Sequence, residues 1–209
     1  MKETLKILSF QTAMVMQNER EKYDQTKWIY VPDFYTDYRY ILGTVGNNPL
    51  ITIGINPSTA EPEKMDNTMK SVEKIAMGNG FDSFIMFNVY AQRATDPNQM
   101  NKEINPMLHK ENMQAFQWIL ENSGKKPIIW AAWGTNIERR KYLKECLREM
   151  INISNRYNAV WCKVGKCSVK GHPHHPLYLK KDSRIEAFDF IMRRRAMKSL
   201  NERMCSKRG

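Results

Sequence analysis

The sequence has few of the features that mark membrane, secreted or multidomain proteins. Its longest uninterrupted apolar run, Ile128 to Trp133, is far shorter than the ~20 residues of a membrane span. The N-terminus is broken by polar residues and has no small-residue cleavage site, which predicts no signal peptide. Internal repeats, low-complexity tracts and Pro/Gly/Ser-rich linkers are absent from the sequence. We therefore expect residues 1–209 to form a single cytoplasmic domain, monomeric and without membrane contact.

Cysteine is also scarce, with four residues in a chain of 209. A chain of this size without an export signal does not need a disulfide framework, so reduced thiols are expected. Cys162, Cys167 and His172 lie close together in the sequence. Their spacing matches no known zinc motif, however, and no fourth ligand is evident. We therefore expect neither a metal site nor a cofactor.

Acidic residues are outnumbered, because 33 Lys and Arg face 22 Asp and Glu, a formal net charge of +11. Hydrophobic residues make up 42% of the chain, which is enough for a folded core and excludes a mainly disordered protein. A strongly basic chain favours a polyanionic partner, nucleic acid ahead of a membrane surface.

Short apolar runs alternate with helical patterns along most of the chain. Strands are expected at residues 38–45, 50–55, 84–87, 128–132 and 159–164, and helices at 67–77, 107–120, 136–150 and 182–204. The first of these helices is expected to be capped by Asp66 or Asn67. Turn residues at 46–49 predict a hairpin between the first two strands. This alternation predicts an α/β fold, a three-layer αβα sandwich around a mostly parallel four-stranded sheet.

The expected core covers residues 38–180. Before it, residues 1–37 are expected to form a lead-in, a helix followed by an irregular aromatic-rich stretch; after it, residues 182–204 are the basic helix. Three expected strands run directly into polar segments at 54–60, 88–97 and 171–178. Because functional residues gather beyond the carboxyl ends of parallel strands, these segments are expected to meet at one cleft.

Four motifs occur in chain order: GINPST at 54–59, IMFN at 85–88, AAWG at 131–134 and HPHHPL at 172–177. In this order they resemble the uracil-DNA glycosylase superfamily, whose mismatch-specific branch has GINPG at the first motif. The combination of NPSTA, RATDP, AWG and GHPxHPLY also resembles the bacterial and phage family DUF1643. The resemblance to the glycosylases implies their fold, DNA as the partner, and hydrolysis of the N-glycosidic bond of uracil or a 5-substituted pyrimidine by base flipping.

The same resemblance implies roles for individual residues. Asn56 would hold the attacking water, at a position where the classical enzymes have Asp. An amide can orient water but cannot act as a strong base, so a carboxylate at position 56 is expected to speed excision if the turn keeps its shape. The alternative is that Asn56 only closes an Asn-Pro turn.

Asn88 matches the residue whose amide reads uracil. It would accept from N3–H and donate to O4 of the base, whereas the amino group of cytosine would face a donor. The alternative is an amide that satisfies backbone groups at the end of a strand.

His172 matches the histidine that donates to O2 of the base and stabilises the leaving anion. The loop has one extra residue, so an alignment from Leu177 backwards places His175 there instead. Both histidines stay candidates, with His172 preferred, and His174 is expected to face solvent.

The remaining implied roles concern the base pocket and the DNA backbone. Leu177, with Tyr178 beside it, would fill the gap left by the flipped nucleotide. Ser58 is small where the classical enzymes have Tyr, which leaves room at C5 of the base. The implied substrate-binding residues are Gly54, Ile55, Pro57, Ser58, Asn88, Leu177 and Tyr178, and the implied phosphate contacts are Arg93, Lys170 and Lys180.

Two other functions compete with a glycosylase. One is a DNA-binding protein that has the fold but excises weakly or not at all. The other is an enzyme that acts on free nucleosides or nucleotides, which the basic charge disfavours. The joint presence of Asn56, Asn88 and His172 favours the glycosylase, because a protein that only binds DNA does not need all three.

Overall fold

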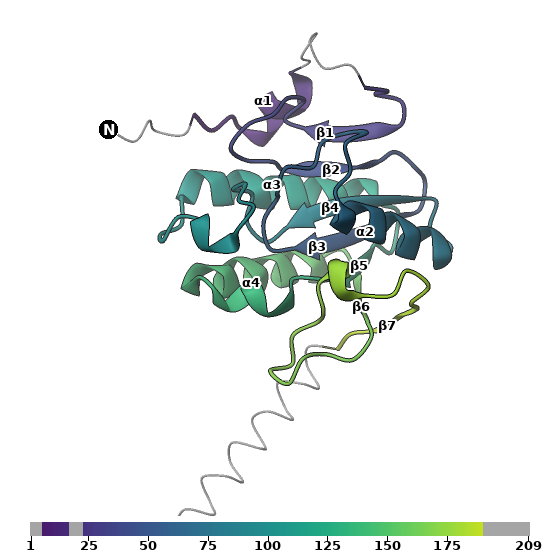
Figure 1. Cartoon of the computed structure of the whole chain (residues 1–209). Helices are drawn as coiled ribbons and strands as arrows, with labels where there is room; N and C mark the ends of the chain where they lie inside the picture. Colours follow the sequence, from purple (N-terminus) through teal and green to yellow (C-terminus); the bar gives the residue numbers. More distant parts are fainter. Residues whose placement is uncertain (1–5, 17–22, 190–209) are drawn as a thin grey trace, which may run out of the picture.

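The computed structural model describes residues 6–16 and 23–189 and shows an α/β fold built on one mixed sheet (Figure 1). The sheet has seven strands in the order β1-β2-β4-β3-β5-β6-β7. The strands are β1 Trp28–Val31, β2 Ile41–Thr44, β3 Pro49–Gly54, β4 Ser83–Asn88, β5 Ile128–Ala131, β6 Val160–Val164 and β7 Ile185–Ala187. The α-helices are α1 Phe10–Val15, α2 Asn67–Gly78, α3 Pro106–Asn122 and α4 Lys141–Asn155. Short 3-10 helices lie at η1 Pro97–Gln99, η2 Gly134–Glu138 and η3 Pro176–Tyr178.

The centre of the sheet is parallel, with β4, β3, β5 and β6 side by side. These strands are continuous apolar runs because both of their faces are covered. Ile51 and Ile85 belong to the core cluster that contains residues of α3 and α4, whereas Leu50 and Phe84 belong to the cluster that contains residues of α2. Helices therefore pack on both faces of the sheet, and the sequence-based expectation of an α/β fold is confirmed.

The expectation of a mostly parallel four-stranded sheet is wrong in its detail. The expected core strands form the centre, but three antiparallel strands extend the sheet at its edges. β1 was expected to be irregular, yet it pairs with β2. β7 was expected to lie in a helix over 182–204, yet it pairs with β6. The rest of that predicted helix, from residue 190 onwards, lies outside the described residues. In both cases backbone hydrogen bonds along the edge of the neighbouring strand outweigh the local helical or loop preference.

The predicted hairpin at 46–49 is also wrong. β2 and β3 do not pair, because β4 lies between them and is antiparallel to β2 and parallel to β3. The turn is held by Asp82 at the start of β4, whose carboxylate accepts from the backbone N–H groups of Asn47 and Asn48 at 2.9 Å each. A side chain at Gly46 would lie within 2.5 Å of Asp82 Oδ1, so this close approach requires glycine. The turn at 46–49 therefore connects β2 to β3 across β4 and does not close a hairpin.

The helices agree with the expected positions, with shifted ends. The side chain of Asp66 caps α2 by accepting from Met69 N at 2.8 Å, which confirms one of the two expected caps. α3 begins at Pro106 behind an Asn105 cap. The helix expected at 136–150 is divided into η2 and α4. Within the described residues, no helix has the length and apolar character that crossing a membrane requires.

Candidate functional site

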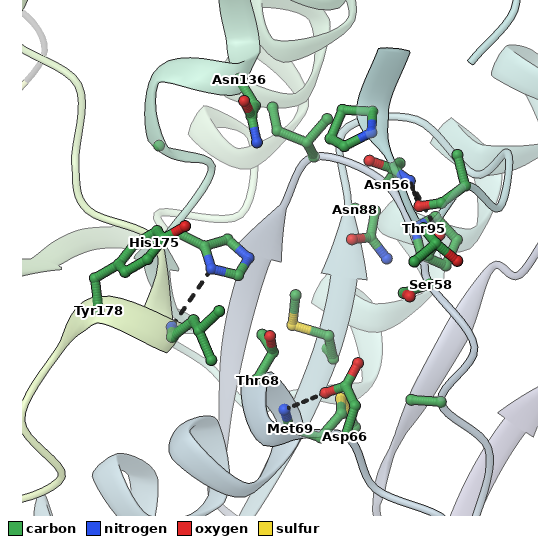
Figure 2. Close-up of a pocket in the computed structure, with 18 of the residues that line it drawn as sticks. Asn56, Ser58, Asp66, Thr68, Met69, Asn88, Thr95, Asn136, His175 and Tyr178 are labelled. Atoms are coloured by element: carbon green, nitrogen blue, oxygen red, sulfur yellow. Dashed lines mark hydrogen bonds between the residues drawn. The ribbon is translucent and has the colours of Figure 1, made fainter. Parts of the chain in front are cut away.

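A pocket of about 500 Å³ lies at the carboxyl ends of β3, β4 and β5. This volume is within the range of pockets that enclose small ligands. Residues of all three polar segments line it, so the expected convergence is observed. The lining residues discussed below are Arg39, Ile55, Asn56, Pro57, Ser58, Asp66, Thr68, Met86, Asn88, Thr135, Asn136, His174, His175, Leu177 and Tyr178. Figure 2 shows Asn56, Asn88 and His175 facing the same space.

Asn88 is the most unusual residue of this pocket. Its side chain is 1% exposed, and within the described residues neither the nitrogen nor the oxygen of its amide has a hydrogen-bond partner. Leaving a buried polar group unpaired costs about 1–3 kcal/mol each. An unpaired buried polar group calls for an explanation, and a ligand that completes its hydrogen bonds is one such explanation. Asn88 therefore has one donor and one acceptor ready for a partner that enters the pocket (Figure 2).

Gly54, at the end of the neighbouring strand, makes space for this amide. A Cβ atom at Gly54 would lie 2.9 Å from Asn88 Oδ1 and 2.6 Å from Met86 Cε. Gly54 does not itself line the pocket, but Ile55 and Pro57, which follow it, do. Glycine at this position therefore lets β3 approach the Asn88 side chain closely.

Asn56 uses its amide nitrogen to hold the backbone around the pocket. Nδ2 donates to the carbonyl of Ala94 at 2.7 Å and to that of Pro57 at 3.0 Å. The alternative of an amide that closes the Asn-Pro turn is thus observed. Its oxygen has no hydrogen bond in the part of the chain that the structure describes, and the residue lines the pocket (Figure 2). Asn56 therefore presents an acceptor to the cavity while its nitrogen stays engaged.

This geometry changes the expected effect of a carboxylate at position 56. We expect Asn56→Asp to lower the free energy of unfolding by about 1–3 kcal/mol, because two donors disappear and a charged oxygen faces two carbonyl groups. The turn is therefore not expected to keep its shape, which was the condition for a faster reaction with a carboxylate at position 56. Thermal denaturation of Asn56→Asp beside Asn56→Ala, which loses the donors without adding charge, measures the difference. An Asn56→Asp protein as stable as the wild type would contradict this prediction.

His175 lies in the pocket with a defined ring orientation. Nδ1 accepts a hydrogen bond from Leu177 N at 3.4 Å, which leaves the proton on Nε2 in the neutral ring. Figure 2 shows the other ring nitrogen directed toward the cavity. Burial lowers the pKa of His175, although the Asp66 carboxylate acts in the opposite direction. His175 is therefore a neutral donor toward the pocket at pH 7.

His172 does not belong to this pocket, so the preference for it over His175 is corrected. Its Nε2 lies 3.2 Å from Oε1 of Glu138, while Lys170 binds the other oxygen of the same carboxylate at 2.6 Å. Hydrogen bonds from Lys170 and from His172 lower the pKa of Glu138 to about 2. His172 thus lies in this surface cluster, whereas His175 lines the pocket. His174, expected to face solvent, lines the pocket as well.

Of the three expected phosphate contacts, two are engaged within the protein. Arg93 donates to the backbone oxygens of Ser58 and Ala60 and to the hydroxyl of Tyr30, and its guanidinium lies over the ring of Tyr35. Arg93 thus holds the backbone of Ser58 and Ala60, which line the pocket, but does not line the pocket itself. Lys170 is paired with Glu138. Lys180 is exposed.

The mouth of the pocket has an apolar rim. Leu177 is 47% exposed and Tyr178 is 80% exposed, and both residues also line the cavity. Exposed apolar side chains that form a continuous patch are typical of a contact surface. Ser58 also lines the pocket and lies opposite Tyr178 in the view of Figure 2.

Sequence reasoning missed several lining residues. Thr135 and Asn136 follow β5, at the same edge of the sheet as the expected segments, so their position after a strand is a usable signal. Asp66 and Thr68 were assigned only to the start of a helix. Arg39 had no signal, since it precedes an antiparallel strand. In the described ranges no group of three or more His, Cys, Asp or Glu residues is arranged for a metal ion.

Comparison with known proteins gives one match. The family model described as "Protein of unknown function (DUF1643)" matches residues 39–177. No curated protein matches, and no solved structure matches. None of these comparisons links the chain to the uracil-DNA glycosylase superfamily. The matched segment covers most of the sheet and the pocket, and the chain belongs to the DUF1643 family.

Proposed function

We propose that the pocket binds a pyrimidine base, uracil or a close relative, and that the protein hydrolyses the N-glycosidic bond of this base in DNA. The observation that carries the proposal is the Asn88 amide, buried and unpaired at the base of the cavity. Uracil offers an N–H beside a carbonyl oxygen, the complement of one amide oxygen and one amide nitrogen.

The other residues fit the steps of such a reaction. His175 Nε2–H donates to the second carbonyl oxygen of the base and stabilises the anion that forms as the bond breaks. Asn56 Oδ1 accepts from a water molecule and holds it beside the sugar. Asn56 is neutral, so water attack depends on the position of the water and on the stabilised leaving group. The proton that the water loses goes to the released base anion. Leu177 and Tyr178 at the rim fill the gap in the base stack that a flipped nucleotide leaves, as their exposure allows.

An excision assay tests the proposal. We expect the protein to release base from single- or double-stranded oligonucleotides that contain uracil, thymine mismatches or 5-substituted pyrimidines, which is read out as alkali-cleavable abasic sites. Oligonucleotides with cytosine at the same position give the base preference, because cytosine differs from uracil at the edge that faces the Asn88 amide. If DNA binds but no base is released from any of them, the protein is a DNA-binding protein with this fold and the proposed hydrolysis is wrong.

DNA binding itself should depend steeply on salt. In a plot of log affinity against log salt, each neutralised phosphate contributes a slope of about −0.9 for duplex DNA and about −0.7 for single strands. A chain of net charge +11 is expected to contact several phosphates. Fluorescence anisotropy between low and moderate salt measures the slope. An affinity that stays level across this range would exclude DNA as the partner.

A further inference from the structure

The same pocket contains a buried guanidinium that the proposed reaction does not use. Arg39 is 2% exposed and lines the cavity. Its Nη1 donates to the carbonyl of Ala60 at 3.0 Å, while Nε is buried without a hydrogen-bond partner in the described part of the chain. Burial lowers the pKa of Arg39 to about 9, so the group stays charged at pH 7. A buried charge that is not neutralised by an ion pair costs several kcal/mol.

No carboxylate of the described residues lies within ion-pair distance of Arg39. A second guanidinium, that of Arg93, approaches the same backbone carbonyl, at 3.3 Å from Ala60 O. Repulsion from the guanidinium of Arg93 is one of the causes that lower the pKa of Arg39. This wall of the pocket therefore has an excess of positive charge.

Asp66 is the negative group to weigh against them. It lines the pocket and attracts both Arg39 and His175 at longer range, but one of its oxygens caps α2. The first turn of α2 contributes Thr68 and the positive end of the helix dipole to the same cavity (Figure 2). The single negative charge of Asp66 is therefore outweighed by the guanidinium groups of Arg39 and Arg93 together with the positive end of α2.

We infer that the base bound in this pocket carries an anionic group, a ring carboxylate, and that Arg39 binds it. This inference rests on the proposed recognition of a pyrimidine by Asn88. The anion belongs to the base and not to the DNA backbone, because Arg39 and Asn88 are both almost fully buried in one cavity whereas a backbone phosphate stays at its mouth. The volume of about 500 Å³ leaves room for a substituted ring.

Direct titration of small ligands tests the inference without relying on excision. The ligands are uracil, uracil-5-carboxylate, uracil-6-carboxylate, the neutral uracil-5-carboxamide and uridine 5′-monophosphate, measured by calorimetry or NMR. We expect one of the two carboxylates to bind roughly 10- to 100-fold more tightly than uracil and the carboxamide, as for a hydrogen bond to a charged group. The monophosphate distinguishes a phosphate on the sugar from a carboxylate on the ring.

Two variants test whether Arg39 causes the tighter binding of the carboxylate. Arg39→Met should remove the preference for the carboxylate while uracil binding is retained, because Asn88 is unchanged. Asp66→Asn should increase that preference, since Asn caps a helix as well as Asp but has no charge. The comparison of ligands on the wild-type protein stands even if Arg39→Met does not fold.

Three results would overturn the inference. Equal affinities for uracil, the carboxamide and both carboxylates would leave base recognition in place and remove the anion site. Tight binding of the monophosphate alone would assign the charge of Arg39 to a phosphate. If none of the five ligands binds, both the inference and the proposed base recognition are wrong.

Discussion

Asn88→Leu is expected to abolish base binding and, at the same time, to raise the free energy of unfolding by about 1 kcal/mol. The substitution breaks no hydrogen bond among the described residues, and it replaces two buried unpaired polar atoms by apolar atoms of similar shape. A residue kept for stability would show the opposite effect. At a functional site that lowers stability, a substitution can reduce function and raise the free energy of unfolding at the same time.

Asn112 supplies a matched control for this experiment. It is also a fully buried asparagine with an oxygen that is unpaired among the described residues, but its Nδ2 donates to the carbonyls of Asn88 and Val89 at 3.1 and 3.3 Å. Asn112→Leu should therefore destabilise the protein by about 1–3 kcal/mol, because it leaves those carbonyls unpaired. Chemical denaturation and uracil titration of both variants give the comparison. If Asn88→Leu unfolds as easily as Asn112→Leu, then Asn88 is a structural residue and not a reader of the base.

His175→Ala is expected to slow excision by roughly 10²- to 10³-fold, the usual effect of removing one donor from a developing anion. His172→Ala should leave the rate near that of the wild type, because its ring is bound to Glu138 outside the pocket. Single-turnover kinetics is the appropriate measurement, since slow product release can hide the chemical step. A larger loss in His172→Ala would return the assignment to the residue that sequence alignment prefers.

The role of His175 also predicts a dependence on pH. Its pKa is lowered by burial, so protonation occurs only below the ordinary imidazole value of about 6.5. Excision should stay level from pH 8 to pH 7 and fall on the acid side, when a proton on Nδ1 displaces the hydrogen bond from Leu177 N. This decline should be missing in His175→Ala. A rate that rises through the acid range would mean that the charged ring is the active form.

Several features of the fold were predictable from sequence because their causes are local. β3, β4, β5 and β6 are short apolar runs with polar ends, as expected for strands covered on both faces. The Asp66 cap lies directly before the helical pattern that it begins. The convergence of the polar segments followed from the parallel direction of these strands alone.

Other features depend on partners that lie far away in the sequence. Residues 28–31 and 185–187 are strands because the edges of β2 and β6 offer them backbone groups, and the 46–49 turn is held by Asp82. A sequence pattern contains no information about which distant edge is available. The sheet therefore has seven strands, which the local sequence patterns did not predict.

Sequence determined by itself which polar segments form the candidate site, and only the tertiary structure decided what each side chain does there. Asn56 and Asn88 are both asparagines at strand ends, yet one amide nitrogen is tied to two carbonyls and the other amide is unpaired. His175 faces the cavity and His172 does not, although only two residues separate them. Arg39 reaches the pocket from the segment before β2, which carries no motif. The physical reason is that hydrogen-bond satisfaction and burial depend on neighbours brought close by folding, which no spacing along the chain specifies.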